Sequence, residues 1–283
     1  MNYRHHFHAG NFADVWKHIV LIALLQALAR KEKPYFYFDS HAGSGLYSLQ
    51  DPQAEKTGEF QQGVGKIWQN ATQEPLLNTY QQLVRLYNPH ALAHYPGSPS
   101  IAQQLMRDHD RAILCELHPE DGELLRRHFA GQSRFTVLQQ NGYQTLNAQL
   151  PPRERRGLVL LDPPYEKDDF SATLAAVIAA AKRWETGCFA VWYPIKARAA
   201  IDSWHRQWVK SGISKIAVAE LCVARDDNPL RLNGSGMLIV NPPWQLEDAL
   251  APTAQVLLPQ LKTDPFAHWR WHWLVEEKSD TRG

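Results

Sequence analysis

The chain has 283 residues, a formal net charge of +1 at pH 7 and three cysteines. This length fits one large domain with room for a small insertion, and the near-neutral charge means that any nucleic-acid surface must be a local patch. The cysteines, Cys115, Cys188 and Cys222, are odd in number, widely spaced and free of any CxxC pair. This pattern argues against a disulfide framework or a zinc knuckle and indicates buried free thiols.

The N-terminus does not resemble a signal peptide, and the apolar run at 19–25 is too short to span a bilayer. We therefore expect a cytoplasmic protein. Asn11 is a candidate N-cap for a first helix, and Pro34 is a candidate terminator. Asp14 and His18 share one polar face of this helix with Asn11, while a separate apolar stripe is spaced for burial.

Strand-like and helix-like runs alternate along most of the chain. Strands are expected at 35–39, 112–117, 135–139, 157–161, 189–193, 215–223 and 237–240. Helices are expected at 99–110, 119–130, 170–184 and 198–211. The alternation predicts an α/β fold with a mostly parallel seven-stranded sheet and helices on both faces. No helix separates the last two strands, so one of them should be antiparallel. The alternating tail at 268–273 predicts a further strand, which we expect at an edge.

Residues 50–95 differ from the rest of the chain in composition and hydrophobic pattern. They are rich in glutamine, carry no strand pattern and are compatible with helices at 59–70 and 75–87. We interpret this segment as a helical insertion subdomain within a single domain that spans 1–283.

The tetrapeptide Asp162-Pro163-Pro164-Tyr165 directly follows the apolar strand at 157–161. In a parallel sheet this position lies at the ligand crevice. The lone pair of an adenine amino group is delocalised into the ring, but a side-chain acceptor on Asp162 and the carbonyl of Pro163 can hold both amino hydrogens and free that lone pair. Tyr165 offers a face on which a flipped base can stack. An ordinary turn after a strand is the alternative interpretation.

Three further strand ends carry candidate ligand-binding residues. A glycine-bearing turn at 39–45 includes His41 and lets the backbone approach a ligand. Glu116 follows the second expected strand, where an acidic residue often holds ribose hydroxyls. Asn141 and Gly142 follow the third. Taken singly, these features also fit a packing turn, a solvated carboxylate and a simple Asn-Gly turn. Their order along the chain is that of a single crevice.

A second tetrapeptide, Asn241-Pro242-Pro243-Trp244, has the same form as Asp162 to Tyr165, with asparagine in place of aspartate and tryptophan in place of tyrosine. It follows the last of the seven strands. If that strand is antiparallel, its carboxyl end lies at the edge of the sheet opposite the expected ligand crevice. We therefore predict a structural role for this motif, at the exit from the strand.

Four histidines near the N-terminus invite a metal interpretation: His5, His6, His8 and His18. They lack acidic partners at a metal-ligand spacing, so no metal site is expected. Tyr3, Arg4 and His8 are better candidates for RNA contact, because arginine can pair with phosphates and tyrosine can stack on a base. Weaker candidates for RNA contact are the basic clusters Arg126-Arg127, Arg153-Arg155-Arg156 and the single Arg198.

Several of these stretches together closely resemble the RlmJ family of bacterial adenine methyltransferases that act on 23S ribosomal RNA. The stretches are 3–18, 39–43, 95–99, Glu116 to Pro119, Asp162 to Tyr165 and Ser235 to Trp244. The N-terminal stretch is the most specific. The resemblance implies a Rossmann-like class I methyltransferase fold, S-adenosylmethionine as cofactor, protein-free 23S ribosomal RNA as substrate partner, and a monomer without a metal or a membrane.

The resemblance also implies roles for individual residues. The cofactor site would be lined by His18, His41, Ser98, Glu116, Asn141, Gly142 and Asp162. Asp162 would be the catalytic acceptor, and Tyr3 would touch the RNA. The sequence departs from the family pattern at Asn141, where that pattern has aspartate. Asparagine keeps a carbonyl acceptor but loses the charge.

Two other functions remain open on the sequence. A DNA adenine methyltransferase uses the same catalytic tetrapeptide, but such enzymes usually carry a larger target-recognition domain than the insertion at 50–95. A non-enzymatic RNA-binding protein would have no need for Asp162. A nicotinamide-dependent dehydrogenase shares the crevice but leaves Asp162 to Tyr165 unexplained, and fold analogy alone does not decide.

Overall fold

The structure is a computed structural model that describes residues 8–166 and 168–277. The chain runs through the following elements: α1 (Phe12–Ala29), β1 (Phe36–Asp39), β2 (Leu46–Ser48), α2 (Pro52–Thr57), the 3₁₀ turns η2 (Glu59–Gln62) and η3 (Val64–Lys66), α3 (Pro75–Leu86), β3 (His94–Pro96), α4 (Ser98–Leu105), β4 (Arg111–Cys115), α5 (Pro119–His128), β5 (Phe135–Leu138), α6 (Gly142–Gln149), β6 (Gly157–Leu161), α7 (Asp169–Arg183), β7 (Cys188–Ile195), α8 (Arg198–Lys210), β8 (Ile216–Cys222), β9 (Gly234–Val240), α9 (Leu246–Leu261) and β10 (His268–Val275).

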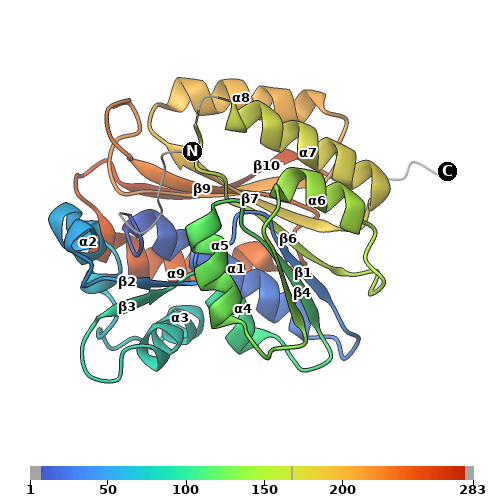
Figure 1. Ribbon diagram of the computed structural model, residues 1–283. Helices are drawn as coiled ribbons and strands as arrows, with labels where there is room; N and C mark the ends of the chain where they lie inside the picture. The colour runs from blue at the N-terminus through green and yellow to red at the C-terminus, as the bar shows by residue number, and fades with distance from the viewer. Residues whose placement is uncertain (1–7, 167, 278–283) are drawn as a thin grey trace.

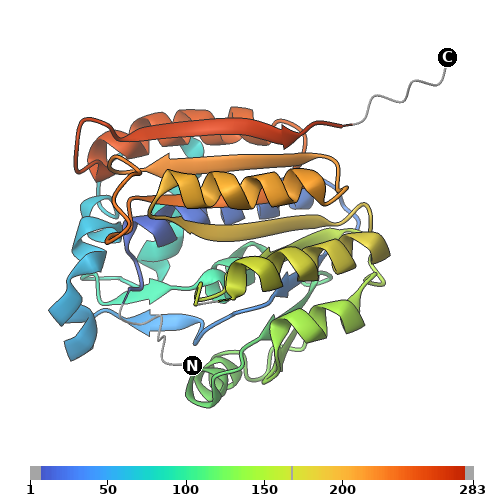
Figure 2. The same cartoon turned by 90° about the horizontal axis from the view of Figure 1, so that it is seen from above.

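The main sheet has the strand order β10-β8-β9-β7-β6-β1-β4-β5. Strands β7, β6, β1, β4 and β5 pair in parallel, whereas β9 is antiparallel to both of its neighbours. The predicted α/β class and the reversed strand are confirmed. The strand number is corrected from seven to eight, because the aromatic tail forms β10 and pairs antiparallel with β8 at the edge of the sheet (Figure 2).

Helices cover both faces of this sheet, with α6, α7 and α8 on one side and α1, α4 and α9 on the other (Figure 1). All four residues of β1 and all five of β6 are buried. Such strands read as near-continuous apolar runs because both of their faces are covered. This burial explains why the Phe36–Asp39 and Gly157–Leu161 segments are recognisable in the sequence, and why the polar residues that follow them mark the sheet edge.

Helix α1 begins at the predicted cap, because the Asn11 side chain accepts hydrogen bonds from two backbone N–H groups of the first turn. By length and composition this helix could cross a membrane, but most of it is buried inside the protein. Its first turns pack on the antiparallel part of the sheet. Nε1 of Trp16 donates to the carbonyl of Ala219 over 3.2 Å, and Oγ of Ser235 donates to the carbonyl of Ala13 over 3.0 Å.

The segment at 50–95 contains α2, η2, η3 and α3, and strands β2 and β3 pair with each other where it leaves and rejoins the rest of the chain. The helix predicted at 59–70 is wrong, since two short 3₁₀ turns occupy much of it. Gly63 explains the break: a Cβ there would lie 2.2 Å from the carbonyl oxygen of Gly10, so the two backbones meet at a distance that only glycine permits.

Candidate active site

Parallel strands β1, β4 and β6 end at one edge of the sheet, and a first cavity lies there. Its lining residues are Lys17, His18, His41, Ala42, Gly43, Tyr47, Gly97, Ser98, Glu116, His118, Asp121, Asp162 and Pro164. Five of the seven residues predicted for the cofactor site therefore come together here: His18, His41, Ser98, Glu116 and Asp162. They come from α1, α4 and three strand ends, so the topology assembles what the sequence keeps far apart.

Glu116 is fixed against the glycine turn. Its two carboxylate oxygens accept hydrogen bonds from the backbone N–H of Gly43 over 2.8 Å and of His118 over 2.7 Å. Burial raises the pKa of Glu116, and these two donors oppose the rise. Gly43 has a φ of +60°, and a Cβ at this position would lie 1.9 Å from the Tyr47 hydroxyl. The turn therefore requires glycine, both for its left-handed backbone and for space.

A buried network stands behind the first cavity. Oδ2 of Asp39 accepts from Oγ of Ser98 over 2.7 Å and from the hydroxyl of Tyr37 over 2.8 Å. Burial raises the pKa of Asp39 to about 6 although these donors lower it. Burial also lowers the pKa of His41 to about 4, so this imidazole is neutral at pH 7. Nδ1 of His18 lies 2.8 Å from the buried Tyr95 hydroxyl. The wall of the cavity is thus pre-organised.

The structure places Asn141 and Gly142 at the end of β5, outside the residues that line the first cavity. Asn141 caps α6, because its side chain accepts from the backbone N–H of Gln144 over 3.1 Å. A Cβ on Gly142 would lie 2.0 Å from the carbonyl oxygen of Ser40. Both residues therefore shape the turn beside β1. Their contact with a cofactor stays a prediction.

A second cavity, of about 420 Å³, opens beside the first, within the size range of small-molecule sites. Its lining residues are His8, Asn11, Ala13, Asp14, Lys17, Glu59, Asp162, Pro163, Pro164, Tyr165, Trp192, Pro194, Lys196, Leu230, Arg231 and Leu232. The predicted tetrapeptide lies whole in this wall. Asp162 and Pro164 line both cavities, so the tetrapeptide forms the boundary between them.

Tyr165 adopts a left-handed backbone with a φ of +54°, which is rare for a bulky residue and marks a functional or strained turn. Its hydroxyl donates to the carbonyl of Trp192, and its ring lies 4.4 Å from that of Phe170, centroid to centroid. The unusual turn therefore fixes an aromatic ring beside Asp162 in the second cavity.

Lys17 is a site residue that the pattern analysis did not single out. Its ammonium lies 2.5 Å from Oδ2 of Asp162 and 2.7 Å from Oδ1 of Asp14, and it is 2% exposed. Burial alone would lower the pKa of Lys17, but the two carboxylates raise it above its ordinary value, so the group stays charged. The available signal was a lysine one helical turn after Asp14 in an otherwise apolar helix.

Of the three residues predicted to contact RNA, Tyr3 and Arg4 lie outside the described residues. His8 lines the second cavity, and its Nδ1 lies 2.9 Å from Oε1 of Glu59. This hydrogen bond raises the pKa of His8 above its ordinary value, against the effect of burial. The place of His8 is consistent with substrate contact, which stays a prediction.

The second tetrapeptide lies at the opposite edge of the sheet, because β9 runs antiparallel. The amide of Asn241 donates to the carbonyl of Glu185 over 2.7 Å and to that of Gly187 over 2.8 Å. Asn241 thus ties the exit of β9 to the turn before β7. This geometry supports the structural role predicted for it.

Arg198, a weak candidate for RNA contact, lies in a largely buried ion network, and its contact with RNA stays a prediction. Its guanidinium donates to both carboxylate oxygens of Glu220, over 3.1 and 3.0 Å, and to Oδ2 of Asp226 over 2.6 Å. Arg270 and the hydroxyl of Tyr193 also donate to Glu220. Burial alone would raise the pKa of Glu220, but the two arginines lower it to about 2.

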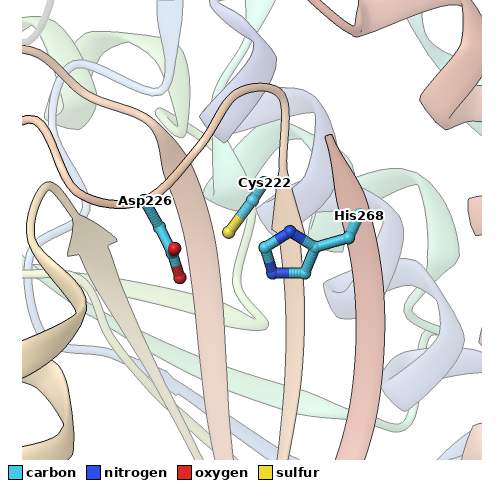
Figure 3. Close-up of side chains that lie close together, drawn as sticks. All are labelled: Cys222, Asp226 and His268. Carbon is cyan, nitrogen blue, oxygen red and sulfur yellow. The ribbon is translucent and has the colours of Figure 1, made fainter. Parts of the chain in front are cut away.

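Three residues of the metal-ligating types, Cys222, Asp226 and His268, meet near the end of β8 (Figure 3). Asp226 already forms the ion pair with Arg198, and Nδ1 of His268 lies 3.1 Å from the carbonyl oxygen of Phe266. Burial raises the pKa of the Cys222 thiol to about 12. Each group has its own local explanation, and Arg198 sets a cation against the carboxylate that a metal would need.

Comparison with known proteins identifies the family. Residues 32–275 match the family described as ribosomal RNA large subunit methyltransferase D, RlmJ. The chain is 41% identical to ribosomal RNA large subunit methyltransferase J of Haemophilus influenzae and 42% identical to that of Escherichia coli, covering 98% of this chain and 100% of either relative. A Legionella pneumophila protein of known crystal structure is 33% identical, with a TM-score of 0.82 over 94% of this chain and 98% of that one. The chain therefore belongs to the RlmJ family of large-subunit ribosomal RNA methyltransferases.

Proposed function

We propose that this enzyme transfers a methyl group from S-adenosylmethionine to the exocyclic amino group of one adenine in 23S ribosomal RNA. The observation that carries the proposal is the position of Asp162, which lines both cavities. The first cavity would hold the cofactor and the second the base. A residue on their common boundary can hold the amino nitrogen in line with the methyl group.

The lining of the first cavity suits the chemistry of S-adenosylmethionine, which supplies an electrophilic methyl group when bound. Each oxygen of Glu116 accepts one backbone hydrogen bond and keeps a lone pair, so the carboxylate can also accept from ribose hydroxyls. The glycine turn brings backbone close to that carboxylate. His41 is neutral and places no positive charge against a sulfonium. Asp162 lines this cavity and the buried Asp39 lies behind it, and their negative charge suits a cationic cofactor.

In the second cavity, Lys17 binds Oδ2 of Asp162, and no other hydrogen bond to this carboxylate is seen among the described residues. Oδ1 is therefore available to accept one adenine amino hydrogen, while the Pro163 carbonyl accepts the other. Proline contributes no competing N–H at this turn. Tyr165 supports the base by stacking. The proton released on methylation is taken by Asp162 or by water.

The names of the relatives support ribosomal RNA as the substrate class. The aligned length of this chain matches theirs, and 50–95 is a short insertion for a DNA target-recognition domain. We include a monomeric state in the proposal because the family resemblance implies one. A ribosomal RNA substrate also supports a cytoplasmic location.

The direct test uses labelled S-adenosylmethionine with protein-free 23S ribosomal RNA and, separately, unmethylated genomic DNA. We expect label in RNA that digests to N(6)-methyladenosine and that disappears in the Asp162→Ala variant. Label in DNA alone would overturn the substrate assignment. Absence of label in both, despite a thermal shift with the cofactor, would overturn the proposed reaction.

A further inference from the structure

The loop between β8 and β9 carries an apolar side chain in an unusual place. Leu230 is 93% exposed, more than any other large apolar residue that the structure describes as exposed. It also lines the second cavity together with Asp162 and Tyr165. An exposed leucine alone needs no explanation, but this one stands at the rim of the cavity that would receive a base.

This loop is held in shape by hydrogen bonds. The buried Asn233 donates to the carbonyl of Asn228 over 2.8 Å and to that of Lys196 over 2.5 Å. The backbone N–H of Leu230 donates to the side chain of Asn228 over 3.0 Å, and Pro229 precedes it. The leucine is therefore held on a fixed turn. Its insertion into a binding partner would lose little additional conformational entropy.

Two cations flank the leucine at the same rim. Lys196 is exposed. Arg231 has a half-exposed side chain; its Nε donates to Asn233 over 2.7 Å, and its Nη2 lies 3.5 Å from Oδ2 of Asp264, which leaves other guanidinium N–H groups for a phosphate. Both line the second cavity. An apolar side chain with cations nearby suits insertion between stacked bases of a nucleic acid. The apolar group contacts the neighbouring bases, and the cations bind the phosphates.

We propose that Leu230 is a wedge that enters the RNA base stack at the space left by the target adenine, with Lys196 and Arg231 on the adjoining phosphates. A base that is methylated inside a cavity must leave the base stack of the RNA. A side chain that fills the vacated space offsets part of the lost stacking energy. This inference rests on the proposed function. It adds a residue that acts on the extruded state of the RNA and not on methyl transfer itself.

The test compares Leu230→Ala, Leu230→Met and the wild-type enzyme on two RNAs. One is a folded, unmethylated 23S fragment that contains the target adenine, and the other is a short unstructured oligonucleotide with the same local sequence. For Leu230→Ala we expect kcat/KM on the folded fragment to fall about tenfold, with less than a twofold change on the oligonucleotide, because the missing wedge affects only unstacking. Leu230→Met retains a long apolar side chain and should keep the wild-type kcat/KM on the folded fragment. Leu86→Ala, at a 64% exposed leucine of α3, is the matched control and should behave as wild type.

A second readout follows the base itself. With 2-aminopurine at the target position of the folded fragment, wild-type enzyme should raise the fluorescence, and Leu230→Ala should lose most of that rise at saturating protein. Equal fluorescence, or equal loss of activity on both RNAs, would overturn the wedge. If wild-type enzyme methylates neither RNA, the proposed function fails, and this outcome is distinct from failure of the wedge.

Discussion

The ammonium of Lys17 lies 2.5 Å from Oδ2 of Asp162, although 145 residues separate them in the chain. The first helix therefore contributes directly to the site formed at the end of β6. We expect Lys17→Met to lower kcat at least tenfold, because Asp162 loses the ammonium group that orients its carboxylate. The buried Asp14 and the partly buried Asp162 would remain without their cation, so stability should fall by about 3–5 kcal/mol.

Single-turnover kinetics and urea unfolding of Lys17→Met measure these two effects separately. Lys17→Arg is the matched control, since it retains charge with a different shape. A variant that is destabilised but has wild-type kcat would show that the lysine only supports the fold.

The two proline-containing tetrapeptides should respond oppositely to alanine. Asp162→Ala is expected to abolish methyl transfer while leaving cofactor binding measurable by calorimetry. Asn241→Ala should keep substantial activity but lower stability by about 1–3 kcal/mol, because it leaves two carbonyl oxygens without their donor. Loss of methylation in a folded Asn241→Ala enzyme would contradict the assignment of the reaction to one edge of the sheet.

Glu116 should control cofactor affinity. In Glu116→Gln, the amide offers one acceptor oxygen in place of two, so the N–H of Gly43 or of His118 loses its partner. We expect the Kd for S-adenosylmethionine to rise about tenfold or more, equivalent to about 1.4 kcal/mol. Isothermal titration measures the change. Glu123→Gln, on the exposed side of α5, is the control and should bind as wild type.

The Glu220 network predicts an acid limb of stability. The pKa of Glu220 is about 2 in the folded protein, below its ordinary value of 4.5. A depressed carboxylate pKa contributes stability that is present above pH 4.5 and is lost as the pH falls toward 2, because the unfolded chain takes up the proton first. Denaturant unfolding at steps from pH 5 to 2.5 measures this slope.

In Glu220→Gln the slope of this limb should be smaller. Stability at neutral pH should already be lower by about 3–5 kcal/mol, because Arg198 and Arg270 lose the buried carboxylate that they share, although Arg198 keeps Asp226. An unchanged slope in the variant would show that other groups cause the acid sensitivity. His205 also lies in the network, and burial lowers its pKa to about 4. Its contribution to the stability of the folded protein is therefore lost as the pH falls from 6.5 to 4.

The sequence predicts most of the parallel sheet because its central strands are buried on both faces and carry uninterrupted apolar runs. Polar residues after those runs, such as Glu116 and Asp162, were identified for the same reason. The helix expected over 59–70 failed at Gly63, since the close backbone approach to Gly10 is a tertiary contact that no local pattern records.

Lys17 illustrates a second limit. Its neighbours Asp14 and His18 were placed on a polar face, but only the docking of α1 against β9 shows that this face meets Asp162. Likewise, Arg198 looked like a surface charge until the fold placed Glu220 beneath it. Charges that are paired across the chain are invisible to spacing rules, whereas residues at strand ends are not.

Helix α1 is anchored to β8 and β9 through Trp16 and Ser235, which lie respectively 203 and 222 residues from their partners. Helix α1 is therefore synthesised well before the strands that fix the position of Lys17. A nascent or truncated chain that ends before β8 contains every residue of the first cavity but lacks the surface that holds α1. Such a fragment is expected to be inactive, so modification of RNA would begin only after β8 and β9 have been synthesised and have folded against α1.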